Sequence, residues 1–290
     1  MNNKLNNMIN DFLANTDAKN EEELNQKLQE FIMQYNMGEI EYENTPLDDA
    51  YEILAKAEQA KTKKQAIKLA KEAYAKCDAC LDAILFQVKL EENPIEQMRL
   101  INAGLLHEKD RLEKENYFKK DNIGHFYGIF ETRPYVIGLY IKARLLCVNG
   151  KIGQAKGVCK EILRLNHNDN TGARYLLMAI YAYFEDENSL LKLYKKYPEE
   201  NLEMLFPLFA LYYKLGNDDK AIDYLNRINK NNPHFIKFFK GTIKENREVL
   251  DYYQMGDSSE VIMYFNSYSF LILPMESLDA YVLQNSKKNK

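Results

Sequence analysis

The chain has 290 residues, of which 46% are hydrophobic and 28% charged, and its formal net charge is −4 at pH 7. This composition is typical of an ordinary folded protein and not of a disordered or membrane-embedded one. A weakly acidic chain also argues against nucleic-acid binding, which depends on Lys and Arg side chains that neutralise phosphates.

Two features predict the cellular location. The longest uninterrupted apolar stretch, Tyr175 to Phe184, is half the length of a membrane-spanning helix, and the N-terminal sequence lacks the apolar core of a secretory signal. Four cysteines are too few for a disulfide framework and suit a reducing compartment. We therefore expect a cytoplasmic protein without a membrane segment.

The first part of the chain predicts helices with alanine-rich contacts. Residues 1–44 have amphipathic patterns and are expected to form an N-terminal helical cap. Residues 45–130 predict degenerate helical repeats, in which Thr45 caps and Pro46 opens the first helix, and three alanines (Ala66, Ala70 and Ala73) stripe the second. A helix over residues 81–91 and a long helix from Pro94 to about Phe118 follow, and a connector completes this part.

The clearest pattern lies in residues 131–235, where positions 66 residues apart carry matching residue types, as Gly150 and Gly216 do. This spacing is close to two units of a repeat of about 34 residues. The glycines end first helices by adopting a left-handed conformation, and Ala155 and Ala221 allow the second helices to approach closely. Between them, residues 174–184 and 189–196 predict a weaker helix pair that ends at Pro198.

Residues 236–290 predict a C-terminal cap of two short helices and a Lys-rich tail, with Asp257 or Ser258 capping the first helix. Terminal repeats need such caps because an end unit otherwise exposes its apolar face.

The order Leu, aromatic or Leu, Gly, Ala, bulky, Ile, Pro resembles the tetratricopeptide repeat. The runs "NPHFIKFFKG" and "MGDSSEVIMYFNSYSFL" resemble the suppression of tumorigenicity protein 7 family, and "GHFYG", "ETRPY" and "ARYLL" resemble an uncharacterised group of bacterial cytosolic tetratricopeptide proteins. The resemblance implies an all-α right-handed superhelix of tetratricopeptide-like helix pairs. It transfers no catalytic motif.

Tetratricopeptide geometry predicts a binding groove, because the first helix of each pair lines the concave face. Arg side chains bind carboxylates and Tyr side chains supply contact area, so an extended peptide that carries carboxylates would suit this face. Alternatively, the arginines pair with internal acids and the tyrosines pack between helices. The candidate groove residues are Tyr140, Arg144, Arg174, Met178, Tyr181, Phe206, Tyr213 and Lys214.

The stretch "GHFYGIFETRPY", residues 124–135, allows two interpretations. As a hinge, it has glycines that let the aromatic segment fold tightly, Thr132 as a helix cap and Pro134 in the first turn. As a functional element, it places four residues at the lip of the groove: His125, Tyr127, Glu131 and Arg133.

The sequence therefore predicts a non-enzymatic scaffold that binds a protein or peptide segment. Two alternatives stay open: a hydrolase-like enzyme that uses His125 and Glu131 as acid and base, and a helical-repeat RNA-binding protein. Cys77 and Cys80 have the spacing of a metal or redox motif, but no second ligand pair accompanies them, and Cys80 is expected to be half-buried. We expect no metal and no cofactor.

Overall fold

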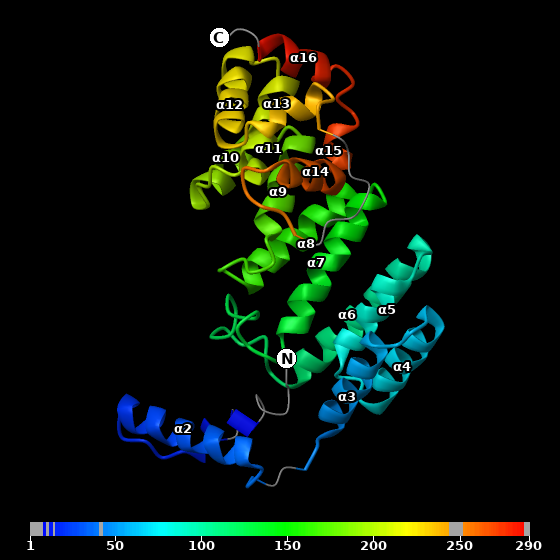
Figure 1. Ribbon diagram of the computed structural model, residues 1–290, viewed down its shortest axis with the longest axis vertical. Helices are drawn as coiled ribbons and strands as arrows, with labels where there is room; N and C mark the ends of the chain where they lie inside the picture. Colours follow the sequence, from blue (N-terminus) through cyan, green and yellow to red (C-terminus); the bar gives the residue numbers. More distant parts are fainter. Residues whose placement is uncertain (1–7, 10–11, 14, 41–42, 244–251, 287–290) are drawn as a thin grey trace. The chain divides into compact units, whose positions relative to one another are not determined.

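A computed structural model describes residues 8–9, 12–13, 15–40, 43–243 and 252–286 (Figure 1). These residues form fifteen helices and no strand, and consecutive helices pack against their neighbours. The predicted all-α helical-repeat fold is therefore confirmed. No helix within the described ranges combines the length and the apolar character that crossing a membrane requires.

Contacts divide the chain into two compact units, Met1–Arg111 and Leu112–Lys290. The division falls within the long helix α6, so the last turn of α6 belongs to the second unit. The four segments expected from the sequence are a finer division than these two units and stay a prediction.

The first unit is built from α2 to α6. As predicted, Thr45 caps α3 and Pro46 is its first residue; the side chain of Asp48 completes a capping box. Small buried residues let α3 and α4 approach closely. The helices of this unit are α2 (Glu21–Met37), α3 (Pro46–Glu58), α4 (Lys63–Lys76), α5 (Leu81–Leu90) and α6 (Pro94–Lys114).

Two sequence-based details of this region were wrong. Helix α6 ends at Lys114 and not near Phe118, because Asn116 adopts a left-handed conformation with φ of 61° and the backbone N–H of Tyr117 turns back to the carbonyl of Leu112. Cys80 is fully buried and not half-buried, because it packs into the α3–α4 core.

The second unit contains the helix pairs that the repeat pattern predicts. Helix α7 packs against α8, α9 against α8, α10 and α11, and α11 against α12. Gly150 and Gly216 have φ of 71° and 67°, and both repeat alanines are fully buried, as expected. The helices are α7 (Arg133–Val148), α8 (Ile152–Leu165), α9 (Ala173–Tyr183), α10 (Glu187–Lys196), α11 (Leu202–Lys214), α12 (Asp218–Asn231) and α13 (His234–Phe239).

The segment before α7 folds tightly against the end of α8. Gly124 and Phe126 donate backbone hydrogen bonds to the carbonyl of Leu165, and the Phe126 side chain is fully buried. Thr132 occupies the N-cap position of α7, but its hydroxyl donates to the carbonyl of Phe126 and caps no helix N–H. The predicted cap interaction of Thr132 was therefore wrong, because the hydroxyl closes the connector instead.

The C-terminal segment, defined as residues 252–286, packs on α9 and α11, the first helices of two repeat pairs, and on α13 (Figure 1). Helix α14 packs against α11 and α13, α15 against α9, and α16 against α13. Asp257 caps α14 as predicted, but the segment forms three helices and not two, because the chain breaks at Tyr268. They are α14 (Ser258–Ser267), α15 (Ser269–Ile272) and α16 (Leu278–Asn285). The Lys-rich tail from residue 287 onward lies outside the described residues.

Candidate functional site

Three of the predicted groove residues meet at one cleft in the second unit. Tyr140 and Arg144 lie on α7, and Arg174 lies on α9. The cleft has an inner lobe of about 260 Å³ and an outer lobe of about 340 Å³, and Tyr140, Glu203 and Tyr253 line both lobes. We call it the tyrosine cleft. The inner lobe is lined by Tyr140, Arg144, Glu203, Tyr253, Glu260, Met263, Tyr264, Ser267 and Tyr268.

Two other predicted groove residues are covered by the C-terminal segment. Phe206 is fully buried, and its ring centroid lies 5.0 Å from that of Tyr264. The hydroxyls of Tyr213 and Ser277 form a hydrogen bond of 2.6 Å, and the ring of Tyr213 lies 4.9 Å from that of Tyr281. Part of the face that the sequence assigned to a partner thus binds a segment of the same chain.

Met178 and Tyr181 do not contribute to an open surface. Met178 is fully buried and Tyr181 is only 6% exposed. The reason is that α9 packs against α8, α10, α11 and α15, so that every residue from 176 to 182 is buried. The placement of Met178, Tyr181 and Phe206 on an exposed face is thereby corrected.

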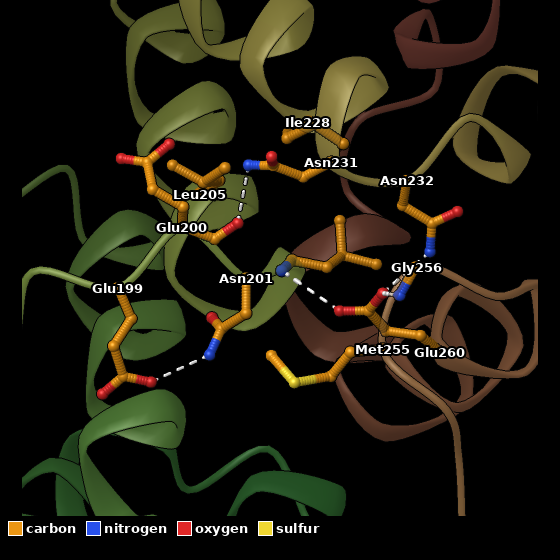
Figure 2. A pocket seen from close by; sticks show the side chains of 11 residues that line it. Glu199, Glu200, Asn201, Leu205, Ile228, Asn231, Asn232, Met255, Gly256 and Glu260 are labelled. Atoms are coloured by element: carbon orange, nitrogen blue, oxygen red, sulfur yellow. Dashed lines mark hydrogen bonds between the residues drawn. The ribbon is translucent and has the colours of Figure 1, made fainter.

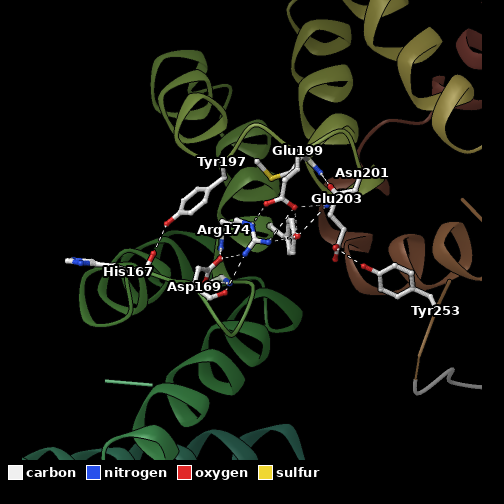
Figure 3. A network of polar contacts seen from close by, with 11 residues as sticks. His167, Asp169, Arg174, Tyr197, Glu199, Asn201, Glu203 and Tyr253 are labelled. Carbon is white, nitrogen blue, oxygen red and sulfur yellow. Dashed lines mark hydrogen bonds and ion pairs between the residues drawn. The ribbon is translucent and has the colours of Figure 1, made fainter. Parts of the chain in front are cut away.

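Arg174 is held by internal acids (Figure 3). Its guanidinium lies 2.9 Å from the carboxylates of both Asp169 and Glu199 and covers the ring of Tyr175 at 4.0 Å. Desolvation lowers the pKa of Arg174, but the hydrogen bonds to Glu199 and Asp169 outweigh it and raise the pKa. Asp169 also accepts the backbone N–H groups of Ala173 and Arg174, so this network caps α9.

Lys214 also has internal partners. Its ammonium lies 3.2 Å from the carboxylate of Glu185 and donates to the carbonyls of Ala182 and Tyr183 at the end of α9. A cation at a helix C-terminus is favoured by the helix dipole. For Arg174 and Lys214, the structure matches the alternative in which cations of the groove serve the fold.

Arg144 differs from both. Its guanidinium lies 5.6 Å from the ring centroid of Tyr268 and lines the inner lobe of the cleft. Within the described ranges, no carboxylate lies within ion-pair distance of Arg144. Burial raises the pKa of the neighbouring Tyr140, and the charge of Arg144 offsets part of that rise. Arg144 is therefore a predicted groove cation without an acidic partner among the described residues, held instead by Tyr140 and Tyr268.

Glu203 stands where the two lobes meet, in the first turn of α11. Its carboxylate accepts hydrogen bonds from the hydroxyls of Tyr253 at 3.0 Å and Tyr268 at 3.3 Å. Desolvation raises the pKa of Glu203, the two hydroxyls offset part of the rise, and the charge of Glu260 adds to it. Figure 3 shows Glu203 and Tyr253 facing each other across the cleft.

Glu260 links the C-terminal segment to the repeat core, and its side chain lines a second pocket of about 440 Å³ (Figure 2). The residue is 4% exposed. Its carboxylate accepts the backbone N–H groups of Leu202 and Gly256 and the side-chain amide of Asn232, at 2.8 to 3.3 Å. The positions of Glu203 and Glu260 were missed by sequence reasoning, since neither belongs to a local motif.

The four predicted lip residues lie in the connector before α7 and at its first residue, and neither lobe of the tyrosine cleft is lined by them. Arg133 donates to the carbonyl of Tyr127 at 2.8 Å and lies over its ring. His125 is exposed, with its ring 6.4 Å from that of His167, and Glu131 is half-buried. The structure thus separates these residues from the cleft.

Two further features concern the metal-ligating side chains and the thiols of the described part of the chain. No group of three or more His, Cys, Asp or Glu side chains there is arranged to hold a metal ion. All four cysteines are free, and burial raises the pKa of Cys80 to about 12, which keeps it a thiol.

No protein-family model matches the chain, and no curated protein matches it.

Proposed function

We propose that the protein is a non-enzymatic binding module that holds a protein or peptide segment in the tyrosine cleft. The observation that carries this proposal is the docking of residues 252–286 on α9 and α11, the first helices of two repeat pairs. That face binds a polypeptide through hydroxyl hydrogen bonds and through tilted or edge-to-face ring contacts, and the adjoining cleft presents further tyrosines. We also propose that the helix pairs are tetratricopeptide-like and related to the suppression of tumorigenicity protein 7 family.

The side chains of the cleft support recognition of a peptide. Tyrosines supply rigid contact area together with hydroxyls that form hydrogen bonds, which is why they are enriched at binding surfaces. Arg144 adds a cation without an acidic partner in the described ranges. A segment in extended conformation would place alternate side chains in the two lobes.

Neither alternative gains an observation of comparable weight. For the hydrolase-like enzyme, His125 is exposed to solvent, whereas proton transfer by a tuned acid and base is favoured by a partly dry site. For the RNA-binding protein, the cleft carries the carboxylates of Asp169, Glu203 and Glu260, which oppose a phosphate backbone.

We place the protein in the cytoplasm and assign it no cofactor. Four free cysteines, three of them buried, support a reducing compartment. These assignments belong to the same proposal.

Recovery of partners from the native cell tests the proposal with a cleft variant and a matched control. The bait is the full chain as wild type, as Tyr140→Ala and as Asp223→Ala, in which Asp223 is an exposed residue of α12 outside the cleft. We expect a protein that wild type and Asp223→Ala recover equally and that Tyr140→Ala loses. Equal recovery by all three baits would refute the cleft as the binding site. Arg174 is unsuitable for this test because its replacement also breaks the network with Asp169 and Glu199.

A further inference from the structure

The inner lobe of the tyrosine cleft has an excess of negative charge. Glu203 and Glu260 line it together with a single cation, Arg144. Hydroxyl and amide groups hold both carboxylates, and no Lys or Arg of the described ranges lies within ion-pair distance of either. Three N–H groups satisfy the buried Glu260, whereas the partly buried Glu203 has only two hydroxyls, so a positive ligand would stabilise this arrangement.

The walls of the lobe are aromatic. Four tyrosines line it, and the face of an aromatic ring attracts a cation. The ring of Tyr268 already takes the guanidinium of Arg144 on its face. Acids set among tyrosine rings are a combination that recognises ammonium and guanidinium groups.

Tyr264 adds an unused polar group. It lines the inner lobe and is 2% exposed, and no described residue forms a hydrogen bond with its hydroxyl. Buried hydroxyls normally have a partner, so one without a partner points to a ligand atom. The hydroxyl oxygen can accept an N–H from a cationic group.

We propose that the inner lobe receives the Lys or Arg side chain of a bound peptide segment. This inference rests on the proposed function and names the chemistry of its partner. The volume of about 260 Å³ equals that of about nine water molecules in the liquid, which is room for one long side chain and not for a folded element. A carboxylate would instead meet Glu203 and Glu260, and like charges brought together disfavour binding.

This peptide carries the opposite charge to the one that the sequence suggested. The sequence pointed to an acidic segment because three cations edge the predicted groove. Two of them, Arg174 and Lys214, have internal acidic partners, while two acids enter the cleft from α11 and α14. Arg144 therefore distinguishes the two expectations: it repels a cationic segment and attracts an acidic one.

Selection from a displayed library of random peptides tests the inference. The full-length protein and its Glu203→Gln variant are used as targets in parallel. We expect the peptides selected on the wild type to be enriched in Lys or Arg, and this enrichment to disappear on the variant. Gln still accepts one of the two tyrosine hydroxyls, and a thermal melt of each target verifies that both are folded.

Titration of one selected peptide shows whether each cleft substitution weakens or strengthens binding. We expect Glu203→Gln to weaken binding about tenfold, Tyr264→Phe to weaken it severalfold without lowering the melting temperature, and Arg144→Gln to tighten it. Asp223→Asn, which removes an acid outside the cleft, should leave binding unchanged.

Two results would overturn the inference, and they differ in whether the proposed peptide-binding function survives. Enrichment of acidic peptides, with weaker binding by Arg144→Gln, refutes the cationic partner but keeps the cleft as a peptide site. Selected peptides that bind all variants equally, or no selected peptides at all, refute the cationic partner and count against the proposed function as well.

Discussion

The hydroxyl of Tyr253 donates a hydrogen bond of 3.0 Å to the carboxylate of Glu203, 50 residues earlier in the chain. Tyr268 donates to the other oxygen of the same carboxylate at 3.3 Å. One side chain of α11 thereby holds two tyrosines of the C-terminal segment. The docking of the C-terminal segment and the charge inside the cleft therefore depend on the same carboxylate.

Replacement of either tyrosine by phenylalanine should weaken the docking of the segment. A hydrogen bond to a charged group contributes about 1.5–3 kcal/mol, and the loss of one donor leaves Glu203 less well satisfied. We expect Tyr253→Phe and Tyr268→Phe each to lower the free energy of unfolding of the second unit by about 1–2 kcal/mol in urea titrations. An unchanged urea midpoint in both variants would show that these hydroxyls do not hold the segment.

Glu203 should also produce a pH dependence. Desolvation raises its folded-state pKa above the ordinary value of 4.5, so the folded protein binds this proton more tightly than the unfolded chain. The contribution of Glu203 to stability therefore falls as the pH rises from about 4.5 through the raised pKa. Wild type should lose stability relative to Glu203→Gln over this window in denaturant titrations at several pH values. If the difference in free energy of unfolding between wild type and Glu203→Gln stays constant with pH, or changes in the opposite direction, Glu203 does not have a raised pKa in the folded protein.

Arg174 should be a large contributor to the fold. The variant Arg174→Ala leaves Asp169, whose side chain is fully buried, without a cation. Breaking a buried ion pair in this way lowers the free energy of unfolding by about 3–5 kcal/mol. Arg164→Ala is the matched control, because Arg164 pairs with Glu161 on the surface of α8, where their side chains are 50% and 38% exposed, and exposed pairs contribute about 0–1 kcal/mol. Chemical denaturation of both variants measures the contrast. Similar losses in the two would contradict the structural role of the Arg174 network.

Gly124 should tolerate no side chain. Its φ is +98°, and a Cβ atom there would lie 2.4 Å from Nδ1 of His167. Gly153 in α8 is the control, because a Cβ at that position meets no atom within 4 Å. We expect Gly124→Ala to lower the melting temperature and Gly153→Ala to raise it, since alanine favours a helix over glycine by about 1 kcal/mol. Two variants with the same melting temperature would contradict the close packing of residues 124–126 on the end of α8.

Local chemistry explains which parts of the fold could be predicted. The capping box at Thr45 and the left-handed glycines Gly150 and Gly216 depend on neighbours within a few residues, so the sequence shows them directly. The hydroxyl of Thr132 has a competing acceptor in the connector, so its predicted cap failed. Propensity and pattern therefore predicted the helix pairs more reliably than the loops.

The site was harder to predict because its contacts are long-range. Arg174 and Glu199 are 25 residues apart, and Tyr213 and Ser277 are 64 apart. No local pattern showed that the C-terminal segment would cover part of the predicted groove or that Glu203 and Glu260 would enter the cleft. The repeat register still placed Tyr140 and Arg144 on the correct helix and near each other.

Photo-crosslinking in the native cell tests whether a partner polypeptide occupies the tyrosine cleft. A benzoyl-phenylalanine in place of Tyr140 reports on the cleft, and the same group in place of Asp223 reports on the surface of α12. We expect a covalent adduct with a partner polypeptide from position 140 that position 223 does not form. Adducts of the same protein from both positions, or from position 223 alone, would contradict it.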